Sequence, residues 1–229
     1  MNWELMIKWM PRLLEGAWLT LELVAIAVLA GLILAIPLGI ARSAQQAWVR
    51  ALPYAYIFFF RGTPLLVQLF LVYYGLAQFE AVRQSAFWPV LRDPYWCAVI
   101  TLTLHTAAYI AEILRGAIQA IPPGEIEAAR ALGMSRGQAL LRIILPRATR
   151  IGLPAYSNEV ILMLKASALA STITLLELTG MSRTIIARTY QPVEIFLMAG
   201  VFYLLSAYVL VRLFRLLEKR LRVDACQGR

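Results

Sequence analysis

The sequence predicts an all-α, polytopic helical membrane protein with five transmembrane helices. Of its 229 residues, 61% are hydrophobic and only 15% are charged, and the charges cluster between long apolar runs, as in multispanning helical proteins. The mean hydropathy of +0.69 excludes an ordinary soluble domain. Five apolar stretches are each about long enough to cross a bilayer, which takes about 20 helical residues.

These stretches divide the chain into three parts. Residues 1–16 are expected to form an interfacial segment, because a helix there would carry apolar side chains on one face and charged ones on the other. Residues 17–215 are expected to form the transmembrane domain, and residues 216–229 a basic tail. The expected spans are residues 18–41, 53–79, 95–118, 151–176 and 192–213, and the polar loops between them include residues 80–94, 121–150 and 177–191.

The basic residues set the expected orientation. Fourteen of the 22 Lys and Arg residues fall on one side of the spans and six on the other, while Arg61 and Lys165 lie inside spans. Cytoplasmic loops carry the excess of Lys and Arg. The N-terminus is therefore expected in the periplasm, and the loop at 121–150 and the C-terminus in the cytoplasm. The net charge of +9 then reflects topology, and no nucleic acid partner is expected.

The loop at residues 121–150 carries dense helix signals. Its proline pair suits the first turn of a helix, where the missing N–H costs nothing, and Gly133 suits a left-handed C-terminal cap. Ser135 and Gln138 have the spacing of a capping box, and Pro146 is expected to end the second helix. The sequence therefore predicts two short helices joined by a tight turn.

The sequence offers neither a catalytic nor a metal site. Cys97 and Cys226 are far apart and His105 is the single histidine, so no metal-ligand spacing is present. The chain also lacks a G-x-x-x-x-G-K-[ST] phosphate loop, so ATP would have to be handled by another chain. We expect a non-enzymatic protein that binds no cofactor itself.

Residues 127–146 resemble the cytoplasmic signature of ABC-importer permeases. Glu127-Ala128-Ala129 is followed after three residues by Gly133, after nine more by Ile143, and after one more by Leu145-Pro146. The break Arg61-Gly62-Thr63-Pro64 and the run at residues 103–112 are similar to the polar amino acid branch of this family. Residues 153–164 are similar to the M-type permease subunit for histidine, lysine, arginine and ornithine. The resemblance covers about residues 15–220, with one departure, since many relatives carry Asn where His105 stands.

The resemblance implies a type I ABC importer of a bacterial inner membrane that moves polar or basic amino acids (the arginine, ornithine, histidine and lysine class) into the cytoplasm. This chain would be its non-catalytic permease, paired with a second, homologous permease. Two ATPase subunits would bind ATP and Mg at the cytoplasmic face, and a periplasmic binding protein would deliver the amino acid. The helical pair would couple the ATPase to transport. The residues implied in that coupling are Glu127, Ala128, Ala129, Gly133, Ile143, Leu145 and Pro146, with the two alanines allowing close approach to the ATPase.

Polar residues inside the spans are candidates for the substrate path, because an ionisable group near a helix centre costs about 2.5–3.5 kcal/mol on insertion scales. Glu159, beside Asn158, would attract a cation in a water-filled cavity, and Lys165 or Arg61 would hold an α-carboxylate. Glu159 and Lys165 are six residues apart and should point to different faces. A structural role, in interhelical pairs or against the partner permease, stays open, especially for Glu112 and Arg61. The full set of candidates is Arg61, Thr63, His105, Thr106, Tyr109, Glu112, Asn158, Glu159 and Lys165.

Two other functions compete with the importer. A stand-alone channel or an ion-coupled secondary amino acid transporter would be expected to show inverted repeats, and none is visible. A membrane receptor or scaffold would have no use for a complete coupling signature. Both alternatives are therefore weaker than the importer.

Overall fold

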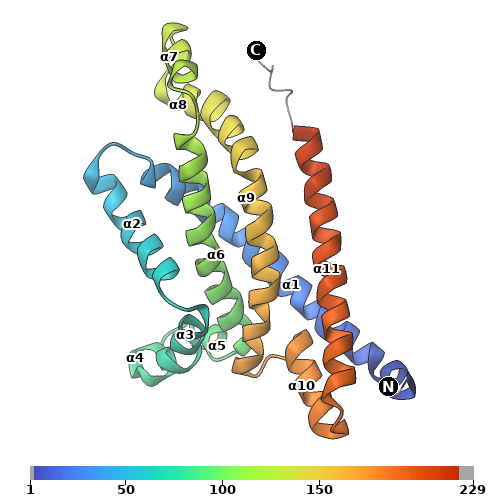
Figure 1. The fold of residues 1–229 in the computed structure, drawn as a ribbon. Helices are drawn as coiled ribbons and strands as arrows, with labels where there is room; N and C mark the ends of the chain where they lie inside the picture. The colour runs from blue at the N-terminus through green and yellow to red at the C-terminus, as the bar shows by residue number, and fades with distance from the viewer. Residues whose placement is uncertain (1–2, 222–229) are drawn as a thin grey trace.

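The computed structural model describes residues 3–221, which are almost entirely helical, with no strand among them (Figure 1). Helix α1 (Trp3–Arg42) runs without a break for 40 residues and contains Pro11 and Pro37. The expected interfacial segment and the first expected span are thus parts of one helix. The predictions for residues 1–2 and 222–229 concern parts of the chain outside the described residues.

The second expected span, residues 53–79, is broken. Helix α2 (Ala47–Gly62) ends at extended Thr63, and after Pro64 the chain continues in α3 (Leu65–Phe70) and two short turns, η1 (Leu71–Gly75) and η2 (Leu76–Gln78). The two halves meet at 104°. Proline disfavours helical geometry at the residue before it, which explains why the break falls at Thr63.

Helix α6 is the most deeply packed element. Two short helices, α4 (Glu80–Arg83) and α5 (Trp88–Leu91), precede it. It spans Pro94–Gln119 and begins where the Asp93 side chain accepts a hydrogen bond from the Tyr95 amide at 2.9 Å. Such a side-chain acceptor satisfies one of the free N–H groups of the first turn.

The second half of the chain differs from expectation at two places. Pro146 does not end a helix: α7 (Pro123–Ala131) and α8 (Arg136–Ala139) lead through η3 (Leu140–Ile144) into α9 (Leu145–Ala166), where Pro146 lies in the first turn. The backbone stays helical through this junction, since Ile144 and Leu145 both have α-helical angles, and the π-turn η3 directly before Pro146 is the kind of local irregularity that accommodates an interior proline. Residues 177–191 are not a loop, because η4 (Ser167–Ile173) is followed by α10 (Leu178–Thr189) and then by α11 (Pro192–Leu221).

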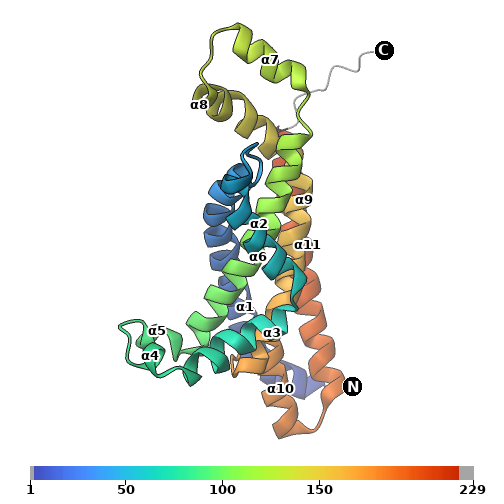
Figure 2. The ribbon, with the colours of Figure 1, turned by 90° about the vertical axis from the view of Figure 1, so that its left-hand side faces the viewer.

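Among the described residues, α1, α6 and α11 are each long and apolar enough to cross a membrane. Two further pairs of helices are long and apolar enough only when both helices of the pair are counted as one bent span. With these two pairs the described residues contain up to five spans. One is α2 with residues 65–78, and the other, bent by 50°, is residues 136–173 with α10. Helices α7 and α8 project at the end where α11 finishes, and α1 begins at the opposite end, near α10 (Figure 2).

Close packing of α1 on α6 holds the fold together. The two helices contact each other over much of their length, and a Cβ added to Gly31 would collide with the Thr106 methyl group. A Cβ on Gly39 would lie 2.9 Å from the Ala111 carbonyl oxygen. Small residues let membrane helices approach closely and gain van der Waals contact, so these glycines set the separation of α1 and α6.

We expect Gly31→Ala to lower the Tm of the purified protein, because the added methyl group cannot fit against Thr106 unless the helices separate. Overpacking of this kind costs about 1–3 kcal/mol. Gly200→Ala on α11 is the matched control, since no neighbouring atom lies within 4 Å of a Cβ there. Equal melting temperatures for the two variants would contradict the close packing of α1 and α6.

Candidate functional site

The turn between α7 and α8 has the predicted conformation. Gly133 has a φ of +75°, and its N–H donates to the Arg130 carbonyl at 2.9 Å while the Met134 N–H donates to the Ala129 carbonyl at 3.1 Å. This pair of bonds is a Schellman motif, which needs a left-handed residue at Gly133. The predicted glycine cap is confirmed.

The predicted capping box is also confirmed. The Gln138 amide donates to Ser135 Oγ at 3.3 Å, and the Ser135 amide donates to Gln138 Oε1 at 2.9 Å. These reciprocal bonds fix the start of α8. We call α7, the turn and α8 the coupling pair, residues 123–139.

The structure gives the signature residues different environments. Glu127 and Ala128 are exposed, but Ala129 is only 1% exposed and packs within this chain. Of the two alanines, Ala128 alone has an exposed side chain. Sequence reasoning missed two apolar side chains on the open surface, Leu132 at 81% and Leu141 at 67% exposure. The signal for them in the sequence was their position, Leu132 beside Gly133 and Leu141 within the expected second helix.

The coupling pair is anchored on α6 and α9 by a small core of its own. Ala117, Ile121 and Ala148 are buried there, and Ile126 and Ile144 pack against them. In addition, Arg147 Nη2 lies 3.3 Å from Glu125 Oε1 and joins α9 to α7. Of the remaining signature residues, Ile143 lies in η3, and Leu145 and Pro146 form the start of α9.

Helix α9 connects the coupling pair to the predicted substrate path. It runs as one helix from Leu145 past Glu159 to Ala166, with Pro154 in its interior. At 1.5 Å per residue, Leu145 and Glu159 are about 21 Å apart along the axis. Helix α9 therefore directly connects the coupling pair to the middle of the protein, and a displacement of the coupling pair can be transmitted along it.

Glu159 is buried between α9 and α6. Its side chain is 6% exposed, and the Thr106 hydroxyl donates to Glu159 Oε1 at 3.4 Å. Asn158 is exposed beside it, so the two residues face different surroundings. Lys165 is exposed too and forms no ion pair with Glu159, as the helical spacing predicts.

A second polar group lies where α2 breaks. Arg61 stacks over the Tyr109 ring at 5.2 Å, and the rings of His105 and Tyr109 are 4.9 Å apart. His105 Nδ1 lies 3.0 Å from Gln68 Oε1. The break and α6 are therefore joined through these polar side chains.

Gln68 is the central residue of that group, and sequence reasoning missed it. Its amide nitrogen donates to the Phe60 carbonyl at 2.9 Å and to Thr63 Oγ1 at 2.8 Å, bridging the break. Gln68 is 3% exposed, and an unpaired buried amide would be costly. A lone glutamine directly after the Arg61–Pro64 break was the available signal.

Glu112 does not join this group as a free carboxylate. Its Oε1 accepts from Arg115 of the same helix at 2.6 Å, which favours the structural role. Arg42, Arg61 and Glu112 together line a hollow of about 270 Å³ between α1, α2 and α6.

Glu177 was expected in a polar loop, but it is fully buried. Its carboxylate accepts from the amides of Thr179 and Gly180 at 3.0 and 2.8 Å. It also accepts from the hydroxyls of Thr20 at 3.3 Å and Tyr203 at 2.9 Å. Glu177 thus caps α10 and binds it to α1 and α11, a role that only the tertiary structure reveals.

We expect Gly133→Ala to loosen the coupling pair, because a left-handed conformation costs a residue with a Cβ about 1–2 kcal/mol. Hydrogen exchange of the amides at residues 127–140 should become faster. Gly137→Ala is the matched control, since it lies in helical α8 with no atom near its Cβ, and it should slow exchange slightly or leave it unchanged. Equal exchange in both variants would argue against the Schellman turn.

Comparison with known proteins identifies the family. Residues 26–223 match the family of the binding-protein-dependent transport system inner membrane component. The chain is 50% identical over 216 residues to the octopine transport system permease protein OccM of Rhizobium meliloti, covering 94% of this chain and 86% of the relative. It is 47% identical over 206 residues to the histidine/lysine/arginine/ornithine transport system permease protein HisM of Escherichia coli strain K12, covering 90% and 87%.

The fold is shared with a solved transporter. A crystal structure of an amino acid ABC transporter with histidines superposes with a TM-score of 0.85 at 34% identity, covering 96% of this chain and 99% of that one. The resemblance to ABC-importer permeases and the all-α fold are thereby confirmed. In this family separate ATPase subunits hydrolyse ATP and a binding protein takes part in transport. The chain belongs to the inner-membrane components of binding-protein-dependent transport systems, as the non-catalytic permease subunit of an ABC importer.

Proposed function

We propose that this permease moves amino acids with a cationic side chain, the arginine, ornithine, histidine and lysine class, from the periplasm to the cytoplasm. The observation that carries the proposal is the unbroken α9, which bears the end of the coupling signature at Leu145 and the buried Glu159 further along. The relatives named for octopine and for histidine, lysine, arginine and ornithine support this substrate class.

The charges along the proposed path suit such a substrate. Among the residues that the structure describes, Glu159 accepts a hydrogen bond from the Thr106 hydroxyl alone, so its carboxylate keeps acceptor capacity for a cation. Arg61 is exposed at the broken end of α2 and is available to an α-carboxylate. A buried carboxylate is costly in a membrane, and among the described residues no basic side chain forms a salt bridge with Glu159, so a cationic substrate would supply a compensating charge transiently.

We further propose the assembly around this chain. The coupling pair lies in the cytoplasm, with the N-terminus of α1 in the periplasm and the C-terminus of α11 in the cytoplasm. A second, homologous permease completes a heterodimer, and two ATPase subunits hold ATP and Mg, so this chain itself binds no cofactor. Exposed Glu127, Ala128 and Leu132 form the surface that enters the ATPase groove, with Glu127 placed to pair with a basic residue.

The experiment is uptake of labelled arginine by cells that lack this chain, complemented with the wild type or with Glu159→Gln. We expect the wild type to restore uptake, with competition by ornithine and lysine. Glu159→Gln should reduce uptake about tenfold, because one charge-assisted interaction is lost. Citrulline has a similar shape to arginine but an uncharged side chain. Unlabelled citrulline should therefore inhibit the uptake of labelled arginine more strongly in the variant than in the wild type.

Glu4→Gln is the matched control, since Glu4 is exposed at the start of α1. Protein amounts in the membrane are compared for all variants by immunoblot. Uptake that glutamate inhibits as well as ornithine does would overturn the cationic substrate class. An unchanged preference for arginine over citrulline in Glu159→Gln would overturn the role of Glu159.

A further inference from the structure

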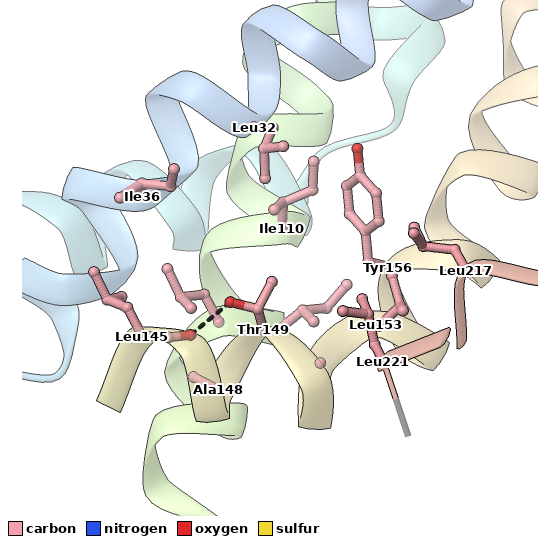
Figure 3. Close-up of a pocket in the computed structure, with 13 residues that line it drawn as sticks. Leu32, Ile36, Ile110, Leu145, Ala148, Thr149, Leu153, Tyr156, Leu217 and Leu221 are labelled. Atoms are coloured by element: carbon pink, nitrogen blue, oxygen red, sulfur yellow. Dashed lines mark hydrogen bonds between the residues drawn. The ribbon is translucent and has the colours of Figure 1, made fainter. Parts of the chain in front are cut away.

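A large apolar groove opens between α9 and α11 on the side of the coupling pair. It has a volume of about 360 Å³, within the range of pockets that hold small ligands. Figure 3 shows Leu32 and Ile110 facing Leu153, Leu217 and Leu221 across it. Of its lining side chains only Thr149 and Tyr156 are polar, and the Thr149 hydroxyl is used in donating to the Leu145 carbonyl.

The groove lies beside an aromatic contact between α9 and α11 and beside a smaller, charged hollow. The rings of Tyr156 and Phe214 meet at 5.8 Å and join α9 to α11. A second hollow of about 230 Å³ adjoins the groove, because Leu153 and Leu221 line both. Its charged lining residues are Arg147, Arg150 and Glu218.

The charge at this rim favours an anion. Arg150 has no side-chain partner among residues 3–221, and Arg147 has a buried Nε atom without a hydrogen bond. Glu218 is the acidic member, but the last turns of α11 around it carry the exposed basic residues Arg215 and Lys219. Basic pockets between transmembrane helices at the cytoplasmic side bind anionic lipid headgroups.

We propose that the two hollows form one binding site for an anionic phospholipid, with an acyl chain in the apolar groove and the phosphate on Arg150 and Arg147. Phosphatidylglycerol fits the rim, since its phosphate carries the negative charge and its glycerol hydroxyls can donate to Glu218. A zwitterionic head would bring an ammonium group into a basic rim. A free phosphate ion would leave the groove unused.

The site lies where the coupling pair joins the transmembrane helices. Arg147 lines the rim and also pairs with Glu125 of α7, and Leu145 and Ala148 at the start of α9 line the groove. A lipid bound there contacts the base of α9 and shares Arg147 with the coupling pair. The lipid thus becomes part of the anchor of the coupling pair.

The test is native mass spectrometry of the purified importer complex titrated with dioleoylphosphatidylglycerol, dioleoylphosphatidylethanolamine or inorganic phosphate. We expect phosphatidylglycerol to bind the wild type more tightly than phosphatidylethanolamine, and phosphate alone not to compete. Arg150→Gln should weaken phosphatidylglycerol binding about tenfold through loss of a charge-assisted contact. Leu217→Trp should abolish it, because the indole fills the groove.

Each variant has a neighbour as control. Arg220→Gln removes an exposed positive charge of α11 that lines neither hollow, and Leu216→Trp adds the same indole at an exposed position outside the groove. Both should bind as the wild type does. Equal binding by Arg150→Gln and Arg220→Gln, by the two tryptophan variants, or by the two lipids would overturn the proposal. Because no transport is measured, the result is independent of the substrate.

Discussion

The close approach of α1 and α6 is the constraint on which the rest of the structure depends. Gly31 leaves room for the Thr106 methyl group, and the hydroxyl of the same threonine donates to Glu159 on α9. One side chain thus serves both the tightest helix contact and the buried carboxylate. Any widening of the α1–α6 contact would move Thr106 and leave Glu159 without that donor, which is expensive inside a membrane. A change in the packing of α1 on α6 would therefore also change the hydrogen bonding of Glu159.

Two other buried polar side chains also link helices to one another. Each fixes the relative position of helices that apolar packing alone would not determine. Gln68 bridges the break after α2 and reaches His105 on α6, and Glu177 binds α10 to Thr20 of α1 and Tyr203 of α11. Transmembrane helices gain little from apolar contact with one another in place of lipid, so interhelical hydrogen bonds and small residues define their arrangement. Within this arrangement of helices, α9 directly connects the coupling pair to Glu159.

Local structure was predictable from the sequence where local chemistry determines it. Gly133 and the Ser135–Gln138 box need only their own neighbours, and both have the predicted geometry. Pro146 misled because helical backbone continues through it from η3 into α9. The break at Arg61–Pro64 was visible in the sequence, but its bend of 104° was not. Two features depend on helices that are distant in sequence. One is the burial of Glu177, and the other is the burial of Ala129 while its neighbour Ala128 is exposed. The sequence named the candidate polar residues, but tertiary packing determines which of them contact each other, with Thr106 on Glu159 and with Arg61, Tyr109, His105 and Gln68 in a second cluster.

The coupling pair is anchored on α9 by the core around Ala148 and by the Arg147–Glu125 pair. From this anchoring we infer the central claim, that the coupling pair and α9 move as one body. The direct measurement is the distance between spin labels at exposed Leu132 and Leu162, in a cysteine-free importer shown to transport arginine, without nucleotide and with bound ATP. The account predicts the same peak distance in both states. A change of about 5 Å or more, one helical turn, would show that the coupling pair moves independently of α9 and would contradict the claim.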